Sequence, residues 1–443
     1  MHEPQRSVVA HRARLTIAHA AGAVTHPLRQ LRQLRRRGRY GQDGQVTDLS
    51  TLRADAAALH PELVVLRRDL HRRPELGLHL PVTQARVLAE LDGLGLEITL
   101  GGGLSSVVAV LRGGRPGPAV LLRADMDALP VTEESGEPFT SVVAGASHVC
   151  GHDLHTAALV GAARLLTARR GGIAGSVVLM FQPGEEGEAG ARTMVEQGVL
   201  DAAGDRVVAA YALHVLGAVL PAGLVATRAG SILAAADTVR GTVQGRGGHG
   251  SMPFLAADPV PVACEIVLAL QTMVTRTFNP FDPVVVTVSQ ISAGTAENVI
   301  PPTAHLTATV RSFSEDAHTQ VRERLVRVCE GIAAAHGLTV DVDYAVGYPV
   351  TVNDPGEADR VARVATALLG TQRYFTAPQP ITGSEDFSFV LQQVPGAFLG
   401  LGASPADGDP LAYNHSPLAR FDDSVLGDGA ALLAALALDR LGP

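Results

Sequence analysis

Residues 155–183 read HTAALVGAARLLTARRGGIAGSVVLMFQP, and the fold prediction starts from this stretch. Its first half places apolar residues at helical spacing, and its second half is a continuous apolar run after a glycine-containing turn. The same strand-like pattern occurs at 119–126 (AVLLRADM) and again at 207–215 (VVAAYALHV). Strands that alternate with helices predict an α/β domain with a mostly parallel sheet covered on both faces.

The pattern changes between residues 237 and 346. In order, the segments there predict a strand, a helix, two strands, a helix and a strand. This order, βαββαβ, is typical of a ferredoxin-like α+β unit. We therefore expect a smaller domain at 237–346, inserted between the two parts of a larger domain at 51–236 and 347–443.

The first 50 residues differ from the rest. Nine arginines occur before residue 42 against one acidic residue, Glu3, and the uninterrupted apolar segment of a secretory signal is absent. This composition favours a disordered, arginine-rich extension. A targeting or anion-binding arm is the alternative.

Composition limits the possible chemistry. All 36 basic residues of this 443-residue chain are arginines, which excludes a lysine Schiff base. A formal net charge of -8 argues against a nucleic-acid partner. Three cysteines, an odd number, favour a reducing compartment and so a cytoplasmic location. No apolar run approaches the ~18 residues that cross a bilayer, so no membrane partner is expected.

Residues 148–163, HVCGHDLHTAALVGAA, place Cys150, His152 and His155 directly before a helix. Thiolate and imidazole suit borderline metals such as zinc, manganese, cobalt or nickel. Alone the cluster is a weak signal, because a buried cysteine near a hydrogen-bonded histidine is more common than a metal site.

Two adjacent acids, Glu185 and Glu186, follow the strand at 176–183. They fall at the carboxyl edge of the predicted sheet, where open α/β sheets place their sites. One acid can bind a metal while the other acts as general base. A solvated acidic turn is the alternative.

Two further histidines complete a possible ligand set. His214 ends the strand at 207–215, and His415 lies in the loop AYNHSP. A histidine at a strand end is more often structural. Together with Cys150, His152 and Glu186, however, the two would supply enough donors for two ions if the thiolate bridges them.

Two aspartates, Asp125 and Asp127, end another strand at the same edge. Either could bind an ion or accept a hydrogen bond from a ligating imidazole, and the second role is favoured for Asp127. For Asp125, a turn before Pro130 is an equal alternative.

Eight motifs in this order resemble the amidohydrolase branch of the aminoacylase and carboxypeptidase G-like binuclear metallopeptidases. Members of that branch include hippurate hydrolases, auxin-conjugate hydrolases and N-acetyldiaminopimelate deacetylases. The resemblance runs from about Val64 to the C-terminus. The motifs are LRADMDALP, HVCGHDLHTAALVGAA, FQPGEEGEAGA, ALHV, GRGGHGSMP, NVIP, GSEDFSF and NHSP.

The resemblance implies an enzyme with two divalent ions per subunit (Mn, Zn, Co or Ni), which cleaves N-acyl amino acids by a metal-bound hydroxide. Cys150 stands where other branches have a bridging aspartate, and Glu185 falls on the general base. The remaining ligand positions match His152, Glu186, His214 and His415.

The inserted domain acts in this branch as a lid and dimerisation domain. His249 and Asn298 match lid positions that approach the reacting carbonyl or the substrate carboxylate, with the histidine donated across a homodimer. From composition alone, His249 would be interpreted as a turn residue, because its loop is rich in glycine. Arg311 could anchor the substrate carboxylate, or it could be a solvated residue on its strand.

Two positions depart from the family pattern. Phe254 stands where many relatives have histidine, which would alter the substrate pocket, and Gly184 stands where alanine is more usual. No expected ligand is missing. A dipeptidase of the same fold, or a non-catalytic metal-binding relative, are the alternative functions.

Overall fold

The computed structural model describes residues 49–406 and 412–442. The predicted N-terminal extension, residues 1–50, therefore lies outside the described residues except for its last two. The described chain contains two large sheets, which we take in turn.

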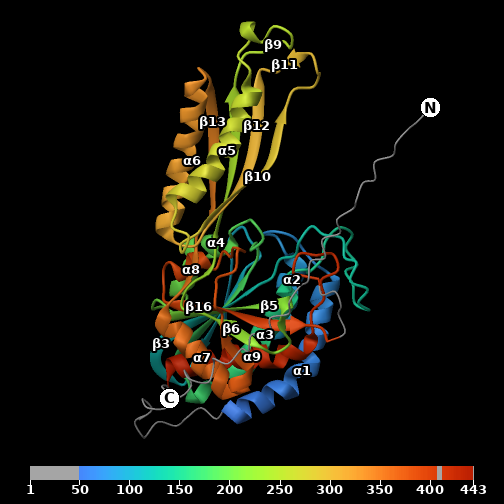
Figure 1. The fold of residues 1–443 in the computed structure, drawn as a ribbon. Coiled ribbons are helices and arrows are strands. Elements are labelled where there is room, and N and C mark those ends of the chain that lie inside the picture. Colours follow the sequence, from blue (N-terminus) through green and yellow to red (C-terminus); the bar gives the residue numbers. More distant parts are fainter. Residues whose placement is uncertain (1–48, 407–411, 443) are drawn as a thin grey trace, which may run out of the picture. The chain divides into compact units, whose positions relative to one another are not determined.

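An eight-stranded sheet forms the centre of the larger body (Figure 1). Its strand order is β1-β2-β4-β3-β5-β16-β6-β15. The neighbours β4, β3, β5 and β16 are parallel, whereas β1, β2 and β6 join the sheet through antiparallel pairs. The prediction of an α/β fold with a largely parallel central sheet is thus confirmed. The strands are β1 (Glu97–Leu100), β2 (Val107–Arg112), β3 (Arg115–Asp125), β4 (Ala174–Gln182), β5 (Ala209–Pro221), β6 (Val225–Thr227), β15 (Tyr374–Thr376) and β16 (Gly396–Ser404).

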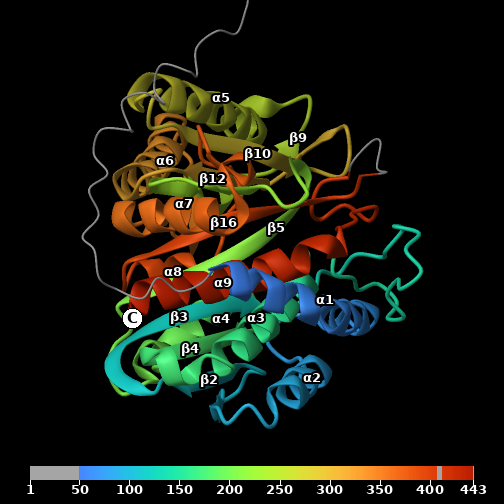
Figure 2. The ribbon, with the colours of Figure 1, turned by 90° about the horizontal axis from the view of Figure 1, so that it is seen from below.

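Helices cover both faces of this sheet, because alternate residues of its strands point to two separate apolar clusters. Along β4, for example, Val177 and Leu179 belong to one cluster, and Val178 and Met180 belong to the other. Helices α1, α3 and α9 pack against one another on the first side (Figure 2). The helices of the larger body are α1 (Leu49–Arg72), α2 (Pro81–Leu91), α3 (His152–Thr167), α4 (Gly190–Glu196), α7 (Pro355–Leu369), α8 (Ser388–Leu391) and α9 (Leu426–Leu441).

A second sheet of four antiparallel strands is formed by residues 235–348, which we call the four-stranded unit. Its sheet order is β10-β12-β8-β13, its element order is βαββαβ, and its helices and strands share an apolar core of their own. Its elements are β8 (Ala235–Gln244), α5 (Pro259–Thr277), β10 (Val284–Ala293), β12 (Thr303–Ser312), α6 (Glu315–Ala335) and β13 (Thr339–Tyr348).

Two short strand pairs complete the topology. β9 (Gly248–His249) pairs with β11 (Val299–Ile300), directly beyond the Gln244 end of β8. At the opposite end of the unit, β7 (Gly230–Leu233) pairs with β14 (Thr351–Asn353). The chain therefore enters and leaves the four-stranded unit through adjacent strands.

Helix α5 is unusually apolar for a partly exposed helix. By length and composition alone it is long and apolar enough to cross a membrane. The sequence contains no uninterrupted apolar run there, because Glu265 and Gln271 interrupt it. A helix of this kind also occurs where one face packs on a sheet, and Ile266 and Leu270 of α5 lie in the core of the four-stranded unit.

Candidate metal centre

The predicted ligands converge at the carboxyl edge of the parallel strands. His214 lies on β5, Glu186 follows β4, and His152 is the first residue of α3. Gly151 makes the approach of α3 possible: its φ is +86°, and a side-chain carbon there would lie 2.3 Å from Val215 Cγ2. Glycine is therefore required between the cysteine and the histidine.

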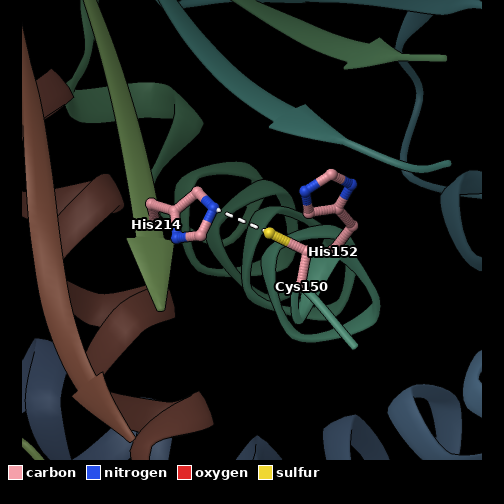
Figure 3. A group of neighbouring side chains, drawn as sticks. All are labelled: Cys150, His152 and His214. Carbon is pink, nitrogen blue, oxygen red and sulfur yellow. Dashed lines mark hydrogen bonds between the residues drawn. The ribbon is translucent and has the colours of Figure 1, made fainter. Parts of the chain in front are cut away.

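The imidazoles of His152 and His214 lie on either side of Cys150 (Figure 3), and main-chain carbonyls hold both rings. Nδ1 of His152 donates to the carbonyl oxygen of Asp127 at 2.8 Å, and Nδ1 of His214 donates to that of Val215 at 2.8 Å. A carbonyl oxygen can only accept, so Nδ1 of each ring carries a proton and Nε2 is the nitrogen left to bind a metal. Nε2 of His152 is buried without a hydrogen-bond partner.

Cys150 lies between two sets of donors. Its Sγ is 3.4 Å from Nε2 of His214 and 3.3 Å from Nε2 of His415. The same His415 nitrogen lies 3.3 Å from Oε1 of Glu186, a buried oxygen without a hydrogen-bond partner. Two triads result, Cys150–His152–His214 and Cys150–Glu186–His415, and the ligand atoms within each lie within 4.8 Å of one another. Two buried atoms without a hydrogen-bond partner, Nε2 of His152 and Oε1 of Glu186, beside a shared sulfur fit two cations.

The charges of the cluster also favour cations. The Cys150 sulfur and the Glu186 carboxylate raise the pKa of His415 to about 10. Burial alone would lower the pKa of His152, but Asp125 and Cys150 raise it well above its ordinary value. Both shifts show an excess of negative charge that attracts positive charge.

His155 is not a free donor, although it belongs to the same sequence cluster. Its Nε2 accepts from the amide of Val215 at 2.8 Å, and its Nδ1 donates to Asp125 at 2.5 Å. Because both ring nitrogens are occupied, His155 orients β5 and Asp125.

The two aspartates hold other residues in place. Asp125 is fully buried, accepts from Arg123 at 2.7 Å, and lies 3.6 Å from Nε2 of His152. The carboxylate of Asp127 accepts from the amides of Glu185 and Glu186 at 3.0 and 2.9 Å. Asp127 thus contacts the imidazole of His152 at 2.8 Å through its carbonyl oxygen, while its carboxylate orients the acidic pair.

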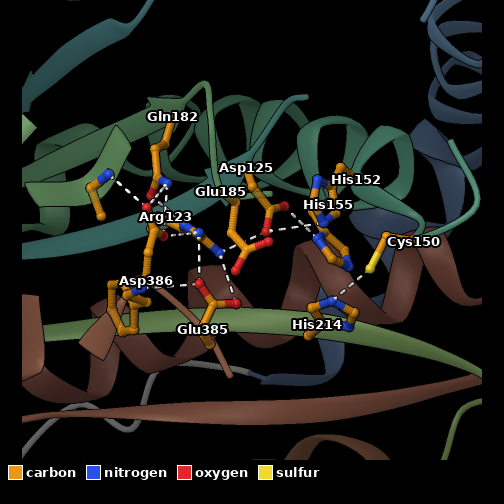
Figure 4. A network of polar contacts seen from close by, with 12 residues as sticks. Arg123, Asp125, Cys150, His152, His155, Gln182, Glu185, His214, Glu385 and Asp386 are labelled. Carbon is orange, nitrogen blue, oxygen red and sulfur yellow. Dashed lines mark hydrogen bonds and ion pairs between the residues drawn. The ribbon is translucent and has the colours of Figure 1, made fainter. Parts of the chain in front are cut away.

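A buried ion cluster beneath the site was not predicted from the sequence (Figure 4). Arg123 is fully buried and donates to Asp125, to Glu385 at 2.8 Å and to Asp386 at 3.0 Å. Burial and the Glu385 carboxylate raise the pKa of Glu185 well above its ordinary value. Two features of the sequence point to this cluster: an arginine inside an apolar strand and the two acids of GSEDFSF. Neither feature alone indicates a role.

A pocket of about 690 Å³ opens over these groups. Its polar wall includes Cys150, Glu185, Glu186, His214 and His415, which lie together as predicted. The rest of the wall is largely apolar or comes from the four-stranded unit, and it includes Leu216, Ile232, Leu233, Phe398, Thr238 and Arg311.

The pocket wall, as far as the structure describes it, does not include His249 or Asn298. Both are exposed and lie on or beside β9 and β11, beyond the Gln244 end of β8. The other end of β8 contributes Ala236 to the pocket. Ten residues of strand span roughly 30 Å, so within one chain these two residues do not reach the ligand cluster.

Comparison with known proteins identifies relatives along most of the chain. The family model described as peptidase family M20/M25/M40 matches residues 121–439. An IAA-amino acid hydrolase of Arabidopsis thaliana (ILR1-like 2) is 39% identical over 86% of this chain and 85% of its own length. An N-acetylcysteine deacetylase of Bacillus subtilis is 36% identical, over 86% and 97% of the two chains.

A solved structure agrees with these matches. The YXEP protein of Bacillus subtilis, described as a dinuclear metal-binding peptidase from the M20 family, superposes with a TM-score of 0.75. It is 33% identical, and the match covers 87% of this chain and 99% of that one.

Proposed function

The chain belongs to peptidase family M20/M25/M40, a family of metal-dependent hydrolases of amide bonds, and from this membership we propose that it cleaves N-acyl amino acids. The observation that carries the proposal is the convergence of a thiol, two imidazoles and two carboxylates on one pocket, with the imidazole of His152 within reach of the same sulfur. A non-catalytic relative is disfavoured, because every candidate ligand and Glu185 are present.

The ligands proposed for two divalent ions are Cys150, His152, Glu186, His214 and His415, with the thiolate shared. Bound there, such ions would polarise the scissile carbonyl and lower the pKa of the attacking water. Manganese, zinc, cobalt and nickel all accept this donor set. Asp125 and Asp127 orient the ligands without binding the ions.

Glu185 is proposed as the general base. It lies in the pocket beside Glu186, and the hydrogen bond from its amide to Asp127 fixes its main chain. From this position its carboxylate can take a proton from the attacking water and return it to the leaving amine. The division of labour follows from the different neighbours of the two acids: Glu186 lies beside Cys150 and His415, whereas Glu185 lies beside Glu385 and Asp386.

The substrate class follows from the rest of the wall and from the relatives. The names of two relatives specify an amino acid conjugate and an N-acetyl amino acid. Arg311 is half-buried and has no carboxylate among its hydrogen-bond partners, Thr309 and the Val310 carbonyl. We infer that it binds the free carboxylate of the substrate, and that the apolar wall accepts the acyl group.

The four-stranded unit is proposed to act as a lid and dimerisation domain, so that residues 235–348 of one subunit complete the pocket of the other. His249 and Asn298 would then reach the pocket of a second subunit, where His249 would donate to the developing oxyanion. Three free cysteines are consistent with a cytoplasmic location.

The test is a substrate panel assayed with and without a chelator. N-acetyl and N-benzoyl amino acids should release free amino acid, and the same compounds with an amidated carboxylate should react poorly. Glu185→Gln should lower kcat by roughly 100- to 10,000-fold. Glu188→Gln, an exposed acid of the same turn, is the matched control and should keep activity.

Three results would overturn the proposal. Full activity of Glu185→Gln would exclude it as base, and activity insensitive to chelation would exclude the ions. Preference for unblocked dipeptides over all N-acyl amino acids would favour the dipeptidase alternative.

A further inference from the structure

The turn that carries Glu185 and Glu186 has an unusual backbone. Gly184 and Gly187 have φ values of +72° and +92°, and Ala189 has a φ of +53°. Glycine adopts such angles freely, but alanine is disfavoured there because its Cβ approaches the carbonyl oxygen. Contacts outside the turn must therefore hold Ala189 in this conformation.

One side of the turn is held by Asp127, through the amides of Glu185 and Glu186. The other side is contacted by the hydroxyl of Tyr348, in addition to the turn's own hydrogen bond from the Gly187 amide to the Glu185 carbonyl at 2.8 Å. The Tyr348 hydroxyl donates to the carbonyl oxygen of Glu185 at 2.5 Å and accepts from the amides of Gly187 and Ala189 at 2.8 and 3.2 Å. All its hydrogen-bonding capacity is thus directed at this turn.

Tyr348 comes from a different part of the molecule. It is the last residue of β13 and pairs with Ala236 of β8, at the end of the four-stranded sheet that borders the pocket. Its ring packs edge-on against Phe389, with centroids 6.1 Å apart. The hydroxyl therefore links the four-stranded unit to the main chain of the acidic pair.

We propose that Tyr348 is a positioning residue for the reaction: its hydroxyl fixes the directions of Glu185 and Glu186 and couples the four-stranded unit to them. The inference rests on the proposed function, because it needs Glu185 as the base. Without the hydroxyl, one carbonyl and two amides lose a partner, and Ala189 is free to relax toward negative φ. The carboxylates would move, whereas the pocket wall, to which Tyr348 contributes, would keep its shape because phenylalanine preserves the ring.

The experiment compares Tyr348→Phe with Tyr344→Phe. Tyr344 lies four residues earlier on the same strand and donates to Asp237 at 2.8 Å, within the four-stranded unit. Tyr348→Phe should lower kcat by roughly 10- to 100-fold, since small misplacements of catalytic groups have effects of this size. KM and thermal stability should change no more than in Tyr344→Phe.

Hydrogen exchange gives a readout that does not depend on activity. In Tyr348→Phe, peptides that cover residues 183–191 should exchange faster than in Tyr344→Phe. Adding Ala189→Gly to Tyr348→Phe should recover part of kcat, because glycine keeps the positive φ without help.

Equal kcat in the two phenylalanine variants would overturn the inference, as would unchanged exchange at 183–191. If Glu185→Gln is inactive in that case, the proposed function still stands. If Glu185→Gln is fully active, the proposed function itself fails. If Tyr348→Phe does not fold, kcat and hydrogen exchange are compared instead between the double variant, Tyr348→Phe with Ala189→Gly, and Tyr344→Phe.

Discussion

Main-chain carbonyls, rather than acidic side chains, accept the Nδ1 protons of His152 and His214. This arrangement leaves Nε2 of both rings as the atom that can bind an ion beside the Cys150 sulfur. An imidazole whose tautomer is already fixed does not have to be reorganised on binding. The chelating geometry is therefore a property of the folded chain itself.

At the residue scale we expect Cys150→Ser to lose metal. A shared thiolate contributes to both triads, so its replacement should weaken binding at least about tenfold and leave fewer than two ions per chain. Elemental analysis after gel filtration measures this. Cys264→Ser, at an exposed position on α5, is the control, and equal metal content in the two variants would contradict the shared ligand.

The roles of some single residues could be inferred from the sequence, and the roles of others could not. Cys150 and His152 are a weak signal alone and became informative only with the motifs around Glu186, His214 and His415. The role of Arg123 could not be read in the same way, because its partners Glu385 and Asp386 follow it by more than 260 positions. Only the packing of distant segments pairs this charge with its acids.

At the element scale, helix α1 and the loop after β3 are joined by a buried carboxylate. Glu133 lies 3.1 Å from Nε2 of His71 and accepts from the amide of Ser141 at 2.7 Å. His71 in turn contacts Asp153 of α3 at 2.7 Å. Despite the opposing effect of burial, these hydrogen bonds lower the pKa of Glu133 from 4.5 to about 2.

The lowered pKa of Glu133 predicts how the free energy of unfolding changes in acid. The stabilisation by Glu133 is fully present above its unfolded pKa near 4.5 and is lost as the pH falls toward 2. Glu133→Gln should therefore lower the free energy of unfolding at pH 7 and flatten its decline between pH 4.5 and 2. Denaturant titrations at several pH values measure both effects, and the exposed Glu134 supplies the control Glu134→Gln. Parallel curves for the wild type and Glu133→Gln would refute this role.

Most elements could be read from the sequence, but not all of their directions. The spacing of apolar residues at 64–76 and 82–96 predicts two helices, and α1 and α2 overlap these segments, although α1 begins earlier, at Leu49. The antiparallel placement of β2 was not predicted, because an apolar run has the same pattern in either direction. The three-residue strands β6 and β15 are too short to show periodicity.

At the scale of the whole molecule, the ligand set joins distant parts of the chain. Cys150 and His415 are 265 positions apart, and β4 and β5 lie between them in sequence. Ions that bind the folded chain alone stabilise it by mass action, by about 2.7 kcal/mol at 100 times Kd.

Removal of the ions should therefore lower Tm by about 5 °C, taking a shift of about 2 °C per kcal/mol for a large domain. Differential scanning calorimetry with and without a chelator measures this, and re-addition of the ion should restore Tm. An identical Tm in both states would mean that the ions do not join the segments as inferred.

The position of β16 between β5 and β6 has a consequence for biosynthesis. β5 and β6 leave the ribosome early, but the strand that separates them is made only after the whole four-stranded unit. At a synthesis rate of roughly 10 residues per second, the delay is on the order of 15 s. During that interval the facing edges of β5 and β6 are unpaired, so the nascent larger body is open to wrong strand pairing while residues 235–348 can already fold.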